Sequence, residues 1–157
     1  MDEQRLSLPA EIARAYARHL SGRPVESSLL ATVAYFATLV IVRSFTTFVR
    51  AEPVQPDISI AGVHIHHLVF GIVALLVSGL FALDEVFRIA RSVLFGIGAA
   101  LVLDEFALLV FLRDVYWLPQ GSLSVVAIVI GFGALIVNAW RGRSFLQAVA
   151  LLVSRRM

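Results

Sequence analysis

Three of the four histidines in this chain lie within the run Val63–Gly71, where a long apolar stretch begins. Two adjacent acids, Asp104 and Glu105, interrupt a second apolar stretch. Ionisable side chains at membrane depth are costly in free energy, so a cluster of them indicates a functional site. Imidazole nitrogens and carboxylate oxygens are also the ligands of zinc and related divalent ions. The residue types therefore predict a metal site or a path for protons.

The hypothesis of a divalent-metal site, with zinc as the expected ion, uses two histidines and both acids. The predicted ligands are His64, His67, Asp104 and Glu105. We expect His66 and Asp114 to lie beside the ligands and orient them. His64 and His67 share a face of a regular helix, whereas His64 and His66 share a side if the chain before His66 is extended. Which of the three histidines bind the metal is left open.

A metal-dependent hydrolase is the first function that this hypothesis suggests. A zinc ion with an open position lowers the pKa of a bound water to about 7, so that the water can attack a lipid-like ester or phosphoester. Asp104 or Glu105 is then the candidate catalytic base, and Arg43 or Arg113 is the candidate to bind a substrate anion. Whether the chain is an enzyme remains open.

Two further interpretations fit the same residues. Acids and histidines along a membrane path also form proton or cation relays, which favours a transporter or channel subunit. Alternatively, the acids pair with Arg43 and the cluster has only a structural role, in a complex with a partner or in an oligomer. Arg43 itself either extends to the membrane interface or turns inward.

The composition predicts that a membrane surrounds these residues. Hydrophobic residues make up 59% of the 157 residues, charged residues make up 15%, and the mean hydropathy is +0.88. A soluble domain would struggle to bury so much apolar surface. Cysteine is absent and every basic residue is an arginine. Disulfides and thiolate metal sites are therefore excluded, and the scattered arginines form no compact nucleic-acid patch.

The elements that must position the polar residues are four membrane helices. We predict an all-α bundle with spans at about residues 28–49, 64–83, 93–112 and 123–140. At about 1.5 Å per residue, such segments cover a hydrocarbon layer of about 30 Å. Residues 1–27 form an N-terminal segment with an amphipathic surface helix over residues 9–20, and residues 141–157 form a basic C-terminal segment.

Arginines beside the spans predict the orientation. An internal N-terminus puts ten of them in the cytoplasm and two, Arg50 and Arg113, outside, as the positive-inside rule requires. No apolar signal segment opens the chain, so we expect both termini to be cytoplasmic in a bacterial inner membrane. His67 and Asp104 then lie near the outer face, roughly 5 to 8 Å apart in depth.

Small residues mark the faces on which the helices are expected to pack. On the second predicted span, small and polar residues occur every three or four positions, at His67, Gly71, Ala74 and Ser78. On the fourth predicted span, Gly131, Ala134 and Asn138 have the same spacing. Small faces let membrane helices approach closely, and such short helices enclose little volume alone. We therefore expect a homo-oligomer surrounded by membrane lipids.

Three motifs resemble those of a group of small bacterial integral membrane proteins of unassigned function. They are the run Val63–Gly71, which reads Val-His-Ile-His-His-Leu-Val-Phe-Gly, the Leu-Asp-Glu-Phe-Ala-Leu of Leu103–Leu108, and the Asp-Val-Tyr-Trp of Asp114–Trp117. The resemblance covers residues 61–117. It implies that the histidines, the acid pair and the aromatic ending form one constellation, and it implies no mechanism.

Overall fold

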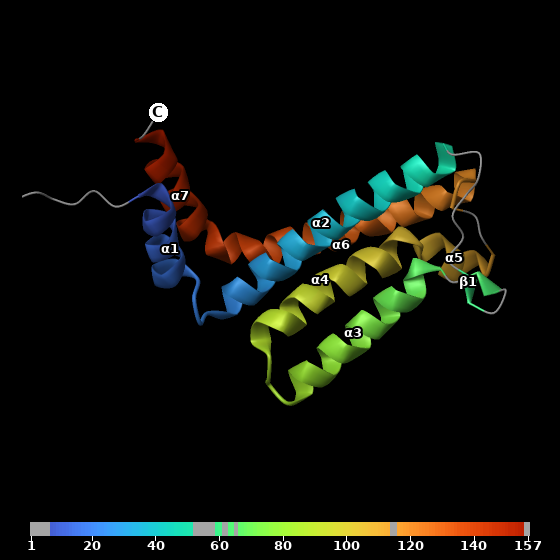
Figure 1. The fold of residues 1–157 in the computed structure, drawn as a ribbon, viewed down its shortest axis with the longest axis horizontal. Coiled ribbons are helices and arrows are strands. Elements are labelled where there is room, and N and C mark those ends of the chain that lie inside the picture. Colours follow the sequence, from blue (N-terminus) through green and yellow to red (C-terminus); the bar gives the residue numbers. More distant parts are fainter. Residues whose placement is uncertain (1–6, 52–58, 61–62, 65, 114–115, 156–157) are drawn as a thin grey trace, which may run out of the picture.

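The computed structural model describes residues 7–51, 59–60, 63–64, 66–113 and 116–155, with the backbone alone at 49–51, 59–60 and 63–64. This part of the chain is helical except for turns, short connections and a pair of two-residue strands (Figure 1). The strands β1 (Ser59–Ile60) and β2 (Val63–His64) are antiparallel, with Ser59 opposite His64. The predicted all-α fold class is therefore confirmed.

Seven α-helices and two short 3-10 turns occur in the described ranges. The helices are α1 (Leu8–His19), α2 (Pro24–Ala51), α3 (His67–Leu83), α4 (Arg88–Asp104), α5 (Phe106–Phe111), α6 (Ser122–Ala139) and α7 (Arg143–Ser154). The turns are η1 (Pro119–Gly121) and η2 (Trp140–Gly142). Figure 1 shows α2, α3, α4 and α6 along one long axis, while α1 and α7 pack together at the end opposite α5.

Helix α4 is the centre of the bundle, because it contacts α2, α3 and α6. Glycines allow these close contacts. A Cβ added to Gly98 would lie 2.8 Å from the carbonyl oxygen of Gly71 on α3, and a Cβ added to Gly96 would collide with the backbone of Ala31 on α2. The small face predicted on the second span is thus a helix-packing face, since Gly71 and Ser78 are both buried.

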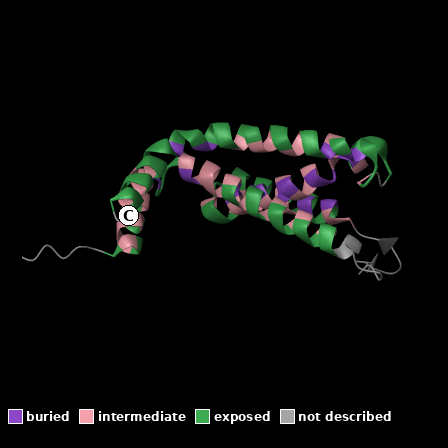
Figure 2. Cartoon of the chain, turned by 90° about the horizontal axis from the view of Figure 1, so that it is seen from above, coloured by how far each residue is buried: buried purple, intermediate pink, exposed green. Residues whose placement is uncertain are grey.

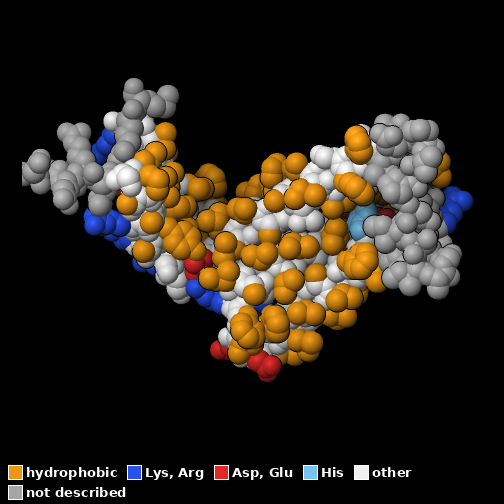
Figure 3. Space-filling view, in the orientation of Figure 1, with side chains coloured by type: hydrophobic (Ala, Val, Ile, Leu, Met, Phe, Trp, Pro, Cys, Tyr) orange, Lys and Arg blue, Asp and Glu red, His pale blue; other side chains and the backbone are white. Residues whose placement is uncertain are grey.

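The distribution of side chains is the reverse of that in a soluble protein. Most of the buried apolar residues are alanines, whereas valines, leucines, isoleucines and phenylalanines cover the outer faces of the bundle (Figures 2 and 3). Polar groups, including Asp104 and Glu105, are buried inside. Soluble domains instead bury their large aliphatic side chains, since that burial stabilises the fold in water.

Among the described residues, two helical segments are long and apolar enough to cross a membrane, Pro24–Phe48 and Pro119–Ser154. The first covers all but the last residue of the predicted span 28–49, and the second contains the predicted span 123–140. The other two predicted spans correspond to shorter helices, since α3 and α4 have 17 residues each.

Two boundaries differ from the prediction, and both lie near the polar residues. The second span does not begin at His64, because His64 belongs to β2 and His66 is extended, with φ −69° and ψ 142°. The interpretation with His64 and His67 on one helical face is therefore wrong. The third span is not continuous: α4 ends at Asp104, and Glu105, with φ −105° and ψ 23°, precedes α5. The predicted surface helix over residues 9–20 is α1.

Candidate functional site

A cluster of polar side chains, built around two buried acids, lies where α4 ends, α3 begins and α2 passes alongside. We call it the histidine–acid cluster. Its members are Arg43, His66, His67, Asp104, Glu105 and Tyr116. Four separate segments supply these residues, so the cluster depends on the tertiary fold.

Asp104 is the innermost member, with a fully buried side chain. Its Oδ2 atom lies 3.1 Å from Nε2 of His67 and accepts a hydrogen bond of 2.8 Å from the Tyr116 hydroxyl. Nε of Arg43 lies 2.5 Å from Oδ1. Among the described residues Oδ1 accepts no well-aligned hydrogen bond, so this contact is ionic. The inward alternative predicted for Arg43 is therefore the one that the structure adopts.

Glu105 joins the cluster to the start of α3. Its Oε2 atom accepts a 2.8 Å hydrogen bond from the backbone N–H of Leu68, and its Oε1 atom lies 2.8 Å from Nδ1 of His66. The first N–H groups of a helix have no partner within the helix, and a negative charge beside them is stabilising. Glu105 thus fixes the start of α3, which explains why the helix begins at His67.

The four titratable side chains form an alternating chain of imidazoles and carboxylates. His66 contacts Glu105, Nδ1 of His67 lies 3.7 Å from Oε2 of Glu105, and Nε2 of His67 contacts Asp104. The cluster thus contains two carboxylates and one arginine, with an imidazole beside each carboxylate.

Tyr116 closes the cluster from the connection between α5 and η1. The guanidinium carbon of Arg43 lies 4.8 Å from the centre of its ring, a cation–π contact. Burial, and next the charge of Asp104, raise the pKa of Tyr116 above its usual value. Tyr116 therefore keeps its proton and donates it in a hydrogen bond to Asp104. The Asp-Val-Tyr-Trp motif identified this region, but the role of Tyr116 was missed.

Family models, curated proteins and solved structures were compared with this chain. None matches it. The resemblance to small bacterial membrane proteins stays a prediction, and the site has to be interpreted from its own chemistry.

The structure brings together most of the predicted site residues. His67, Asp104, Glu105 and Arg43 meet, and His66 contacts Glu105 directly. The role predicted for His66, to orient the ligands of a metal, stays a prediction. For the metal itself, the described residues contain no group of three histidines or acids placed to hold one ion.

Of the three other predicted site residues, two have side chains outside the described residues. The backbone of His64 lies in β2, but its side chain is outside the described residues, as is all of Asp114. Arg113 is exposed after α5, and among the described side chains no ion pair joins it to Asp104 or Glu105. Its predicted role as a partner of Arg43 in binding a substrate anion therefore has no support from a contact.

A second buried polar group, at the opposite end of the bundle, was not predicted. We call it the Glu26 cluster, formed by Tyr16, Glu26 and Arg88. The buried Glu26 carboxylate accepts hydrogen bonds from the Tyr16 hydroxyl, the Arg88 guanidinium and, at 3.1 Å, the backbone N–H of Gly22. These contacts join α1, α2 and α4. The only signal in the sequence was one acid at the edge of an apolar stretch.

Proposed function

We propose that this chain is a four-span membrane protein in which α2, α3, the α4–α5 segment and α6 cross the bilayer. The main support is the distribution of side chains, with small and polar residues inside and large apolar residues outside. The 17 residues of α3 extend for about 26 Å, close to the thickness of the hydrocarbon layer. Because α1 and α7 lie at the same end, an even number of crossings also fits the chain.

The absence of cysteine allows a direct test of this topology. Single cysteines at Ser21 and Ser154 are expected to be protected from a membrane-impermeant maleimide in intact cells. A cysteine at Gln120 is expected to react, because it lies at the other end of the bundle. Labelling of all three positions from outside, or of none, would contradict four spans with cytoplasmic termini.

For the activity, we propose that the histidine–acid cluster is a proton relay, as in a proton transporter or channel subunit. The observation that carries this proposal is the alternating chain His66, Glu105, His67, Asp104, with contacts of 2.8 and 3.1 Å at its two ends and a distance of 3.7 Å between Glu105 and His67. Acids and imidazoles can exchange protons across the two short contacts, and one water molecule would bridge the longer distance.

Burial differs along this chain of side chains. The side chains of His66 and His67 are 26% and 23% exposed, whereas Asp104 is fully buried. A proton would thus enter or leave the relay at the histidines, which are its accessible members. A purely structural cluster would need only enough acid to balance Arg43, and a second acid with two imidazoles exceeds that requirement.

Proton flux in proteoliposomes tests the relay. Wild-type protein, with a pH-sensitive dye inside the vesicles and a potassium-diffusion potential as driving force, is expected to conduct protons. His67→Gln is expected to lower the flux on the order of tenfold or more. His19→Gln, on α1 and outside the cluster, is the matched control and should behave as wild type. Flux equal to that of empty vesicles, or unchanged by His67→Gln, would overturn the relay.

A divalent-metal site is the second candidate, and one distance favours it. Two ligands about 2.1 Å from a zinc ion, at tetrahedral angles, lie about 3.4 Å apart. Nε2 of His67 and Oδ2 of Asp104, at 3.1 Å, have nearly this spacing. His64 is the candidate for a third ligand, and a bound metal would supply an activated water for ester hydrolysis, with Glu105 as the base.

Elemental mass spectrometry of detergent-purified protein separates these two candidates. A metal site predicts near-stoichiometric zinc in wild type and its loss in the His64→Ala/His67→Ala double variant. The relay predicts proton flux that survives treatment with a chelator. Zinc absent even after it is added back would exclude the metal site, and hydrolase assays on lipid esters would follow only if zinc is found.

A further inference from the structure

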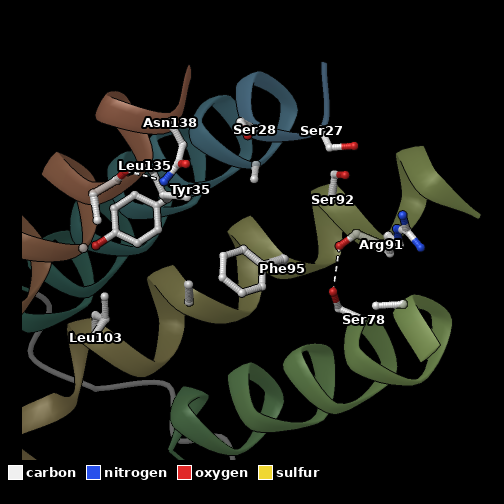
Figure 4. Close-up of a pocket in the computed structure, with 15 residues that line it drawn as sticks. Ser27, Ser28, Tyr35, Ser78, Arg91, Ser92, Phe95, Leu103, Leu135 and Asn138 are labelled. Carbon is white, nitrogen blue, oxygen red and sulfur yellow. Dashed lines mark hydrogen bonds between the residues drawn. The ribbon is translucent and has the colours of Figure 1, made fainter. Parts of the chain in front are cut away.

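A cavity of about 540 Å³ opens in the half of the bundle away from the histidine–acid cluster. Residues of α2, α3, α4 and α6 line it. Figure 4 shows Ser27, Ser28, Ser92 and Arg91 at one end and Tyr35 and Leu103 at the other. The cavity thus extends lengthwise, with Arg91 and the serines at one end, which we call the polar end, and Asn138 beside Leu135. Its volume is within the range of about 300–1,000 Å³ that is typical of ligand pockets.

The closed end of the cavity is formed by tight helix packing. A Cβ added to Gly131 on α6 would collide with Leu103 on α4, so these two helices touch there. The buried Tyr35 fills the space beside them and donates a 3.0 Å hydrogen bond to the carbonyl oxygen of Ile128. These contacts separate the cavity from Asp104, the residue that follows Leu103.

The walls between the two ends are mostly apolar. Ala31, Phe95, Ala99, Ala134 and Leu135 line the cavity, with the amide of Asn138 beside Leu135. Small alanines leave room where larger side chains would close the space. A hydrocarbon chain fits such walls better than water does.

The polar end carries an uncompensated positive charge. Among the described residues Arg91 makes no ion pair, and its Nη1 atom has only a long contact of 3.4 Å to the carbonyl oxygen of Phe81. Its neighbour Arg88 differs, because Glu26 neutralises it. Ser78 and Ser92 already donate their hydroxyl hydrogens to the carbonyl oxygens of Arg91 and Arg88. Ser27 and Ser28 also line the cavity and are the serines whose hydroxyls can donate to a ligand. This end therefore complements an anionic group.

We propose that this cavity binds a single-chain anionic amphiphile, or one chain of an acidic phospholipid, with the anionic group at Arg91 and the hydrocarbon chain along Ala99 toward Tyr35. Carboxylate and phosphate groups present the same charge to Arg91, so the shared chemistry is an anion attached to an acyl chain. The proposal does not depend on whether the histidine–acid cluster moves protons or binds metal.

Photolabelling with a diazirine derivative of palmitic acid tests whether the cavity binds a hydrocarbon chain. Labelling of purified wild-type protein is expected to be saturable and to map to α4 or α6. Ala99→Phe fills the cavity and should reduce labelling by about tenfold. Ala90→Phe places the same side chain on an exposed position of α4 and should leave labelling unchanged. If Ala99→Phe does not fold, Ala134→Phe fills the same space from α6.

The anionic part is tested with the matching diazirine alcohol, which has the same chain without the charge. Arg91→Gln should weaken labelling by the acid but not by the alcohol, while the exposed Arg141→Gln should change neither. Competition by phosphatidylglycerol vesicles, but not phosphatidylcholine vesicles, would identify a phospholipid as the source, and competition by neither would identify the free acid.

Three results would overturn the proposal. The first is equal labelling of the Ala99→Phe and Ala90→Phe variants, because the chain would then bind outside the cavity. The second is equal labelling by acid and alcohol in both wild type and Arg91→Gln, because the charge would then have no role. The third is a cross-link between two copies of the protein at this cavity, because a second copy would then be the occupant.

Discussion

The two ends of the bundle bury similar groups in different proportions. Each end has a buried carboxylate that contacts an arginine and a tyrosine: Glu26 with Arg88 and Tyr16, and Asp104 with Arg43 and Tyr116. In the Glu26 cluster one negative charge meets one positive charge. The histidine–acid cluster has the same arrangement with a second acid and two imidazoles added.

This difference separates a structural group from a candidate functional one. The Glu26 cluster is satisfied by fixed hydrogen bonds and joins α1, α2 and α4, so its role in the fold is complete. The histidine–acid cluster contains more titratable groups than charge balance requires. Surplus ionisable groups in a buried position cost stability and are typical of sites that act on a proton, an ion or a substrate.

The largest effect is expected from Asp104→Ala. Breaking a buried ion pair costs about 3–5 kcal/mol, and we expect about 2–4 kcal/mol here because Arg43 is partly exposed and can reach solvent. Unfolding in mixed detergent and dodecyl sulfate micelles, followed by fluorescence, measures this change. Trp117 is a suitable reporter, because its ring centre lies 4.9 Å from that of Tyr116.

Replacing both partners is the control for this prediction. The double variant Arg43→Met/Asp104→Leu should recover most of the lost stability, because neither charge is left without its partner. An Asp104→Ala protein as stable as wild type would show that the ion pair between Asp104 and Arg43 contributes nothing to stability. The two ends of the bundle would then not share a stabilising buried ion pair.

A smaller effect, about 1–3 kcal/mol, is expected from Glu26→Ala, which removes the acceptor of three hydrogen bonds. Trp140, at the same end as α7, reports this unfolding. Proton flux per folded molecule should equal that of wild type, since the Glu26 cluster has no role in the relay. Loss of flux in a folded Glu26→Ala protein would remove the distinction between the two clusters.

The smallest effect on stability is expected at high pH, where Tyr16 and Tyr116 lose their protons. The hydrogen bond from Tyr16 to Glu26 raises the pKa of Tyr16, and burial raises that of Tyr116, from the usual value of 10.0. A tyrosine whose pKa is higher in the folded than in the unfolded protein stabilises the fold. This contribution is complete below the pKa of the unfolded state, about 10, and is lost as pH increases through the pKa of the folded state. The stability of wild type should therefore decrease above about pH 10.

Tyr16→Phe and Tyr116→Phe are each expected to make this decrease shallower. Each variant is compared with wild type, because the chain has no lysine to titrate in the same range, arginine stays protonated, and Tyr35 is unchanged in all three proteins. Stability curves that run parallel for wild type and both variants between pH 9 and pH 11, roughly one unit either side of the usual tyrosine value, would refute the two tyrosine contributions.

Local patterns in the sequence were enough for two of the helices and for part of the histidine–acid cluster. Apolar runs and arginine positions predicted α2 and α6 closely, because hydrophobicity and length are properties of each segment alone. They also predicted that His67, Asp104 and Glu105 share one site, since helix rise places them at similar depth, but they left the inward position of Arg43 open. The small face of α3 was likewise visible as a repeat of glycine, alanine and serine.

Only the tertiary structure decided which atoms meet. His66 contacts Glu105, 39 residues away, and the turn at Glu105 and the start of α3 depend on each other through the bond to Leu68. The inward position of Tyr116 and the pairing of Glu26 with Arg88, 62 residues apart, follow from how the helices are rotated. Helix rotation is set by close contacts such as Gly71 against Gly98, and periodicity within a single segment carries no information about the partner's face.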